Sequence, residues 1–89
     1  MKVKDGFILR EVGSGFVVVA VGKRASEFNG MISLNETAKV VFEMLQKGAT
    51  REELYNGFMA EFKDLTKEKA KSDVDKFVDA LIKVNVIDE

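Results

Sequence analysis

The sequence has no histidine, cysteine, proline or tryptophan among its 89 residues. Without cysteine the chain can form neither disulfides nor thiolate metal sites, which fits a reducing, cytoplasmic location. Without histidine it lacks the side chain that most often acts as a general base near neutral pH and most often binds zinc. The sequence also shows no recognisable carboxylate pair, so no constellation of nucleophile and base can be named, and we expect no catalysis, no cofactor and no metal site.

The chain also lacks a large net charge and a long apolar run. Its formal net charge is −1, so there is no bulk attraction to nucleic acid or to anionic membranes. No apolar segment approaches the ~18 residues of a membrane span, and residues 1–6 contain no apolar core of signal-peptide length. With 46% hydrophobic and 33% charged residues, the composition predicts a soluble globular protein with a single domain over residues 1–89.

The first half of the chain is rich in β-branched residues and glycine, which favours short strands. Gly13-Ser14-Gly15 is typical of a hairpin turn, and residues 22–29 form a polar connection that ends in the turn signal Asn29-Gly30. The predicted strands are Phe7–Val12, Phe16–Val21 and Met31–Leu34.

The second half has the apolar spacing of amphipathic helices. Asn35 and Thr66 are predicted N-caps, Thr50 and Glu53 form a capping box, and Gly48 is a predicted C-cap. The order β-β-β-α-α-α predicts an α+β fold, in which a three-stranded antiparallel sheet is covered by three helices in a winged helix-turn-helix-like arrangement. After the last helix, Val86-Ile87 is expected to pack back on the body. The predicted helices are Glu36–Lys47, Arg51–Lys63 and Lys67–Lys83.

Several short segments, taken in order, carry a resemblance to a known family. They are Leu34-Asn35-Glu36-Thr37-Ala38, the bulky Phe42, Leu45-Gln46-Lys47-Gly48, Thr50-x-x-Glu53-Leu54 and Asp73-x-x-x-Phe77-x-x-x-Leu81. Together they resemble the PqqD family, the small proteins named for coenzyme PQQ synthesis protein D. The same module recurs as the RiPP recognition element, the leader-binding domain of pathways for ribosomally made, post-translationally modified peptides.

The resemblance implies a non-catalytic peptide chaperone. Such a module binds the leader of a precursor peptide and presents it to a modifying enzyme, often a radical SAM protein, in PQQ or other RiPP biosynthesis. It also implies that the leader pairs as an added strand in the groove between the third strand and the third helix. Met31–Leu34 has no Pro or Lys to discourage such pairing. A bare edge can equally pair with a second copy, so a homodimer is an open alternative.

The two walls of this groove supply the candidate binding residues. Strand alternation places Ile32 and Leu34 on one face, which we expect to be the core face. On the third helix, Val78 and Ile82 are expected at the edge of an apolar stripe that includes Phe77. The sequence does not decide which rim of the helix faces the strand. The candidate peptide-binding residues are Met31, Ile32, Ser33, Leu34, Lys71, Asp75, Val78 and Ile82.

The alternative function is that of a winged-helix DNA-binding transcriptional regulator. The third helix has lysines and acidic residues in near balance, and it has no Arg and no exposed Asn or Gln to contact base edges. The hairpin tip Gly13-Ser14-Gly15 has no basic residue to contact phosphate. The basic surface of a nucleic-acid-binding protein is missing, which disfavours this alternative.

Overall fold

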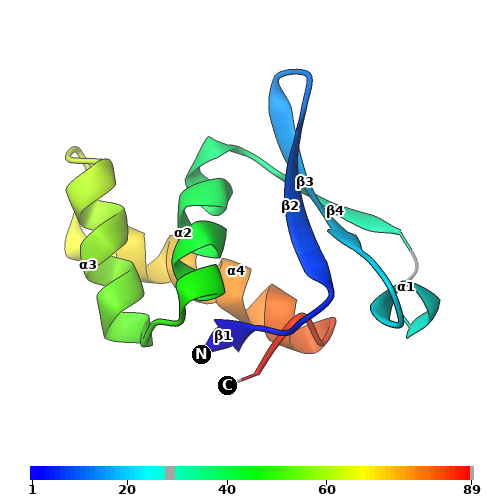
Figure 1. The fold of residues 1–89 in the computed structure, drawn as a ribbon. Helices are drawn as coiled ribbons and strands as arrows, with labels where there is room; N and C mark the ends of the chain where they lie inside the picture. The colour runs from blue at the N-terminus through cyan, green and yellow to red at the C-terminus, as the bar shows by residue number, and fades with distance from the viewer. Residues whose placement is uncertain (28–29, 89) are drawn as a thin grey trace.

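The computed structural model describes residues 1–27 and 30–88, apart from the side chain of Glu27. It confirms the predicted α+β order, a three-stranded antiparallel sheet followed by three long helices (Figure 1). No helix of this described part has both the length and the apolar character needed to cross a membrane. The elements are β1 Lys2–Val3, β2 Phe7–Val12, β3 Gly15–Ala20, α1 Arg24–Glu27, β4 Met31–Leu34, α2 Glu36–Lys47, α3 Arg51–Glu61, α4 Lys67–Lys83 and β5 Ile87–Asp88.

The main sheet has the order β2-β3-β4, and both pairings are antiparallel. Val12 pairs with Gly15, so the hairpin loop holds only two residues, and β3 begins and ends one residue earlier than predicted. Asn29 of the predicted Asn29-Gly30 turn lies outside the described residues. The bounds of β2 and β4 agree with the prediction, because their apolar patterns are flanked by clear turn residues.

Three short elements were not predicted. β1 and β5 pair antiparallel, and the Lys4 amide donates to the Val86 carbonyl at 2.9 Å, which joins the two ends of the chain (Figure 1). As predicted, Val86 and Ile87 are buried. α1 is a single turn within the predicted polar connection, where Arg24 Nε donates to the Asp5 carbonyl at 3.2 Å. A two-residue strand or a single helical turn is too short to show its period in the sequence.

The helix boundaries follow their caps. The Asn35 side chain accepts from the Ala38 amide at 2.9 Å, and the reciprocal bonds of the Thr50–Glu53 capping box are both present. Thr66 caps α4 by accepting from the Lys69 amide at 3.1 Å. Gly48 ends α2 with a φ of 95°, which an L-residue with a side chain rarely adopts. α3 ends at Glu61, two residues before the predicted end at Lys63.

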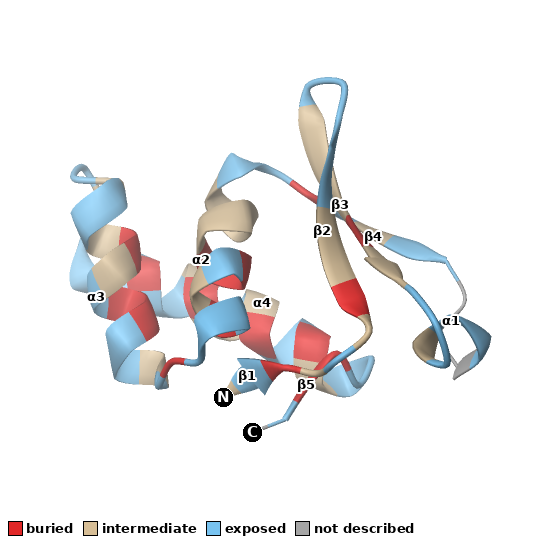
Figure 2. Cartoon of the chain, viewed as in Figure 1, coloured by how far each residue is buried: buried red, intermediate tan, exposed pale blue. Residues whose placement is uncertain are grey.

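The core lies where the inner face of the sheet meets the helices (Figure 2). α2 stands between the sheet and α3 (Figure 1), and the Lys39 ammonium of α2 lies 4.9 Å from the centre of the Phe16 ring on β3. α2 and α3 approach closely because Gly57 leaves room for Met44, whose Sδ would lie 2.7 Å from a Cβ at that position. The largest fully buried side chains are Phe42, Leu45, Leu54, Leu81, Ile87, Val18, Val74, Val78 and Val86.

Candidate functional site

The outer edge of β4 is open. Within the described residues, β4 has β3 as its only hydrogen-bonded neighbour. Leu34 is buried and Ile32 packs against the core, whereas Met31 and Ser33 are exposed, so the predicted alternation is confirmed. The edge therefore presents unpaired main-chain groups to solvent, next to one apolar and one solvated face.

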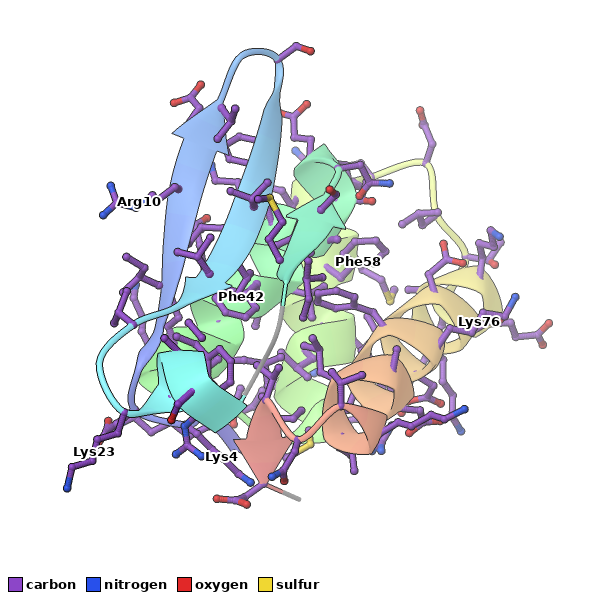
Figure 3. All side chains as sticks on the ribbon, turned by 90° about the vertical axis from the view of Figure 1, so that its right-hand side faces the viewer. Lys4, Arg10, Lys23, Phe42, Phe58 and Lys76 are labelled. Atoms are coloured by element: carbon purple, nitrogen blue, oxygen red, sulfur yellow. The ribbon has the colours of Figure 1, made fainter. Side chains whose placement is uncertain are left out.

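A cleft of about 420 Å³ opens where β4 ends and α2 begins. It lies between the first turns of α2 and the middle of α4, and in Figure 3 Phe58 is seen between β4 and α4. Its floor is apolar, and its polar groups come from the α2 cap and from the solvent side of α4. The lining residues are Asn35, Thr37, Ala38, Val41, Phe58, Asp73, Val74, Lys76 and Phe77.

A second hollow of about 480 Å³ extends the cleft along α3. The two hollows share Thr37, Phe58 and Asp73 as lining residues. The second one ends at the α3–α4 connection, where Phe62 and Leu65 are half-buried. Together the two hollows form an apolar-floored groove that begins at the Leu34 end of β4.

The charges of the groove are distributed unevenly. The Asn35 side chain is occupied by the cap, because its Oδ1 also accepts from the Thr37 hydroxyl at 2.8 Å. Asp73 pairs with Lys69 at 3.1 Å on the same helix. Lys76 forms no ion pair with any residue that the structure describes, and it is exposed at the mouth of the cleft. The mouth of the cleft thus offers the positive charge of Lys76 beside an apolar floor, whereas the second hollow is lined by Glu61, Lys63 and Asp64.

The opposite rim of α4 is bound to α3. Arg51 donates to Oδ1 of Asp75 and to Oδ1 of Asp79, each at 2.9 Å, and the Tyr55 hydroxyl donates to Oδ1 of Asp75 at 2.6 Å. The Tyr55 hydrogen bond, followed by the Arg51 contact, lowers the pKa of the Asp75 carboxyl below its ordinary 3.8. The same bond to Asp75 raises the pKa of Tyr55 above its ordinary 10.0. We call these four side chains the Arg51 cluster.

The structure places the predicted site residues of α4 away from the cleft. Asp75 belongs to the Arg51 cluster, and Lys71 and Ile82 do not line the cleft. The expectation that Val78 lies at the edge of the apolar stripe is wrong, because Val78 has an exposed fraction of 0%. The cleft side of α4 is the other edge of the stripe.

The residues of α4 that line the cleft were not selected from the sequence. They are Asp73, Val74, Lys76 and Phe77, and Phe77 is half-buried although we expected it in the core. The two rims lie on either side of one apolar stripe and have similar composition, so the sequence gives no signal that separates them. Only the packing of α4 against α3 does so.

A larger hollow of about 870 Å³ lies at the far end of the molecule, beside β1 and β5. Three of its charged side chains have partners within the chain: Lys4 contacts Asp88 at 3.4 Å, Arg24 donates to the Asp5 carbonyl, and Glu53 accepts from the Thr50 amide. This hollow lies away from β4, and most of its lining residues are charged or polar.

Comparison with known proteins identifies the family. The family model described as Coenzyme PQQ synthesis protein D (PqqD) matches residues 15–87, which include β4, α2 and α4. The chain belongs to the PqqD family. This confirms the resemblance found in the sequence, and it places both walls of the groove inside the segment that defines the family.

This PqqD-family chain is also similar in fold to a solved structure, "TbiB1 in Complex with the TbiA(beta) Leader Peptide". The TM-score is 0.75, and the match covers 97% of this chain and 93% of that chain at 17% sequence identity. At this identity the likeness establishes the fold. A comparison with curated proteins gives no match.

Proposed function

We propose that this PqqD-family chain is a non-catalytic module that binds the leader of a ribosomally made precursor peptide as an added strand on β4. The module then presents the peptide to a modifying enzyme, such as a radical SAM protein, in PQQ or other RiPP biosynthesis. The observation that carries this proposal is the open edge of β4, which ends one residue before Asn35 at the lip of a cleft with an apolar floor. The similar fold of TbiB1, a protein solved with a leader peptide, supports it.

Strand addition alone gives too little affinity. β4 has four residues, so an added strand gains only a few main-chain hydrogen bonds, each contributing ~1 kcal/mol net. An unfolded leader loses conformational entropy when it becomes ordered, and this cost offsets much of that gain. Side chains of the leader that enter the cleft must therefore supply much of the affinity and most of the specificity.

The cleft indicates which side chains these are. Phe77 and Phe58 line an apolar space that accepts an aliphatic or aromatic side chain of the leader, next to the point where β4 ends. Lys76, at the mouth, favours a carboxylate on a neighbouring residue of the leader. In our proposal the helix half of the site is Asp73, Lys76 and Phe77, and the strand half is Met31–Leu34. Binding through Lys71 and Ile82, the rim predicted from the sequence, is the competing hypothesis, and variants of Phe77 and Ile82 distinguish the two.

The test is an NMR titration of the ¹⁵N-labelled protein with a synthetic leader, taken from the short precursor peptide encoded beside this chain. We expect the largest amide shifts in Met31–Leu34 and in Asp73–Phe77. In strand pairing only every second amide of the leader bonds to β4. Two series of leaders should therefore differ, one N-methylated at odd positions and the other at even positions. The series that loses the amides bonded to β4 should bind more weakly, and the other should bind nearly as well as the unmodified leader.

Three results would count against the proposal. Shifts confined to β2, the other edge of the sheet, would mean that the wrong edge was chosen. If both N-methylated series weakened binding equally, the leader would not bind as an added strand. Shifts along α4 with duplex DNA, reduced by salt and absent with the leader, would support the DNA-binding alternative instead.

A further inference from the structure

We infer that β4 carries a second specificity subsite, centred on Met31, on the face of the sheet opposite the cleft. This inference rests on the proposed function. The subsite selects an apolar side chain of the bound peptide that points outward. This side chain is separated by an odd number of residue positions from the peptide side chain that points toward the cleft.

The register of the sheet produces this subsite. Ile8 on β2 pairs with Val19 on β3, and Val19 pairs with Met31 on β4, so the three side chains form one row across the outer face. The next row, which includes Val18 and Ile32, points the other way, into the molecule.

The outer row is apolar although it lies outside the core. Ile8 and Val19 are half-buried against each other's strands, and Met31 has an exposed fraction of 63% at the end of the row. In the following row of the same face, Arg10 and Ser33 are exposed and polar, and Val17 between them is half-buried. The row that ends at Met31 therefore differs in having an apolar residue at the β4 edge. An exposed methionine that ends an apolar row at an open strand edge can pack against a further side chain placed beside it.

A strand added to β4 places a side chain beside Met31. Neighbouring side chains in adjacent strands point to the same face, whether the strands are parallel or antiparallel. The peptide residue opposite Met31 therefore points outward and extends the apolar row, while the residue opposite Leu34 points toward the helices. Met31 and Leu34 are three positions apart, which corresponds to about 10 Å along the strand.

This geometry predicts an unusual peptide pattern. A peptide that binds by one face only has its apolar residues at even spacing, because side chains alternate. Recognition at both the cleft and Met31 requires apolar residues at an odd spacing, such as three. Cross-strand apolar pairs contribute enough to change affinity by about two- to five-fold each.

The test uses a displayed library of random dodecapeptides, selected on the wild-type protein and on Met31→Ser. We expect wild-type selection to enrich peptides with two apolar positions at odd spacing. Selection on Met31→Ser should retain the cleft position and lose the outward one. Selection on Met31→Leu should again enrich an apolar residue at the outward position. Val12→Ser is the matched control, because Val12 is exposed on the same face of the sheet but lies on β2, at the opposite edge from β4.

A thermodynamic cycle with labelled peptides of the wild-type consensus completes the test. Met31→Ser, and Ser at the outward peptide position, should each weaken binding by about two- to five-fold, and the two changes together should weaken it no further than one alone. This inference would be overturned if selection on the wild type enriched only the position that enters the cleft, and if selection on Met31→Ser enriched the same peptides. The proposed function would still stand. No enriched peptide at all, together with no binding of the synthetic leader, would overturn both.

Discussion

At the scale of single residues, Asn35 stabilises the joint between the strand edge and the cleft. Its side chain caps α2 directly after β4, so it sets the direction in which the chain leaves the sheet. We expect Asn35→Ala to lower the free energy of unfolding by ~1 kcal/mol, because the Ala38 amide loses its acceptor. Chemical denaturation measures this. Asn56→Ala, at an exposed position of α3, is the control and should not destabilise the protein. Equal stability of the two variants would contradict the cap assignment.

Substitutions of Phe77 and Ile82 distinguish which rim of α4 contacts the peptide. Both are half-buried, but only Phe77 lines the cleft. We expect Phe77→Ala to weaken leader binding by about ten-fold or more, since a buried aromatic contact contributes more than ~1.4 kcal/mol, while Ile82→Ala leaves affinity nearly unchanged. Fluorescence anisotropy with a labelled leader gives both values, and circular dichroism checks that each variant is folded. The reverse order of effects would restore the rim selected from the sequence.

At the scale of elements, the Arg51 cluster holds α4 against the start of α3. Because folding lowers the pKa of Asp75, the cluster's stabilisation is present above about pH 4 and is lost as the pH falls through the lower pKa of the folded state. Because folding raises the pKa of Tyr55, that contribution is present below about pH 10 and is lost as the pH rises. The cluster therefore stabilises the protein across the whole neutral range.

This predicts the behaviour of Asp75→Asn. The variant should be less stable than the wild type at pH 7, and the gap should narrow as the pH is lowered below about 4, because the wild type then loses the same charge. Urea denaturation at several pH values measures the gap. Asp64→Asn, in the exposed connection before α4, is the matched control. A gap that stays constant down to acidic pH would show that the charge of Asp75 is not what stabilises the contact.

The sequence pattern predicted some of these elements and missed others. The elements with a clear period and clear caps, such as β4 and α2, were predicted with their correct bounds. β1, β5 and α1 were missed because they are held by long-range pairing or by a single turn, which leaves no local pattern. The strand half of the candidate site was accessible from alternation. The helix half was not, because the orientation of α4 depends on the Arg51 cluster, which joins residues 20 or more positions apart.

At the scale of the whole molecule, peptide binding and folding are linked. A leader that binds only the folded chain should raise the free energy of unfolding by ~2.7 kcal/mol when it is present at about 100 times its Kd. Thermal denaturation with increasing leader concentration measures this. A leader of the same composition in scrambled order should give no shift. A similar shift with both peptides would indicate non-specific association.

The two rims of α4 also have a consequence for how this protein can change over time. One rim is committed to holding the fold together, through Arg51, Tyr55 and two carboxylates, while the other contributes Lys76 and Phe77 to the groove. Substitutions that change peptide specificity therefore fall on one rim of α4, and substitutions that reduce the stability of the fold through the Arg51 cluster fall on the other. Such a helix can acquire a new ligand through a few tolerated substitutions, in a natural lineage or in a designed library, without first losing its native state.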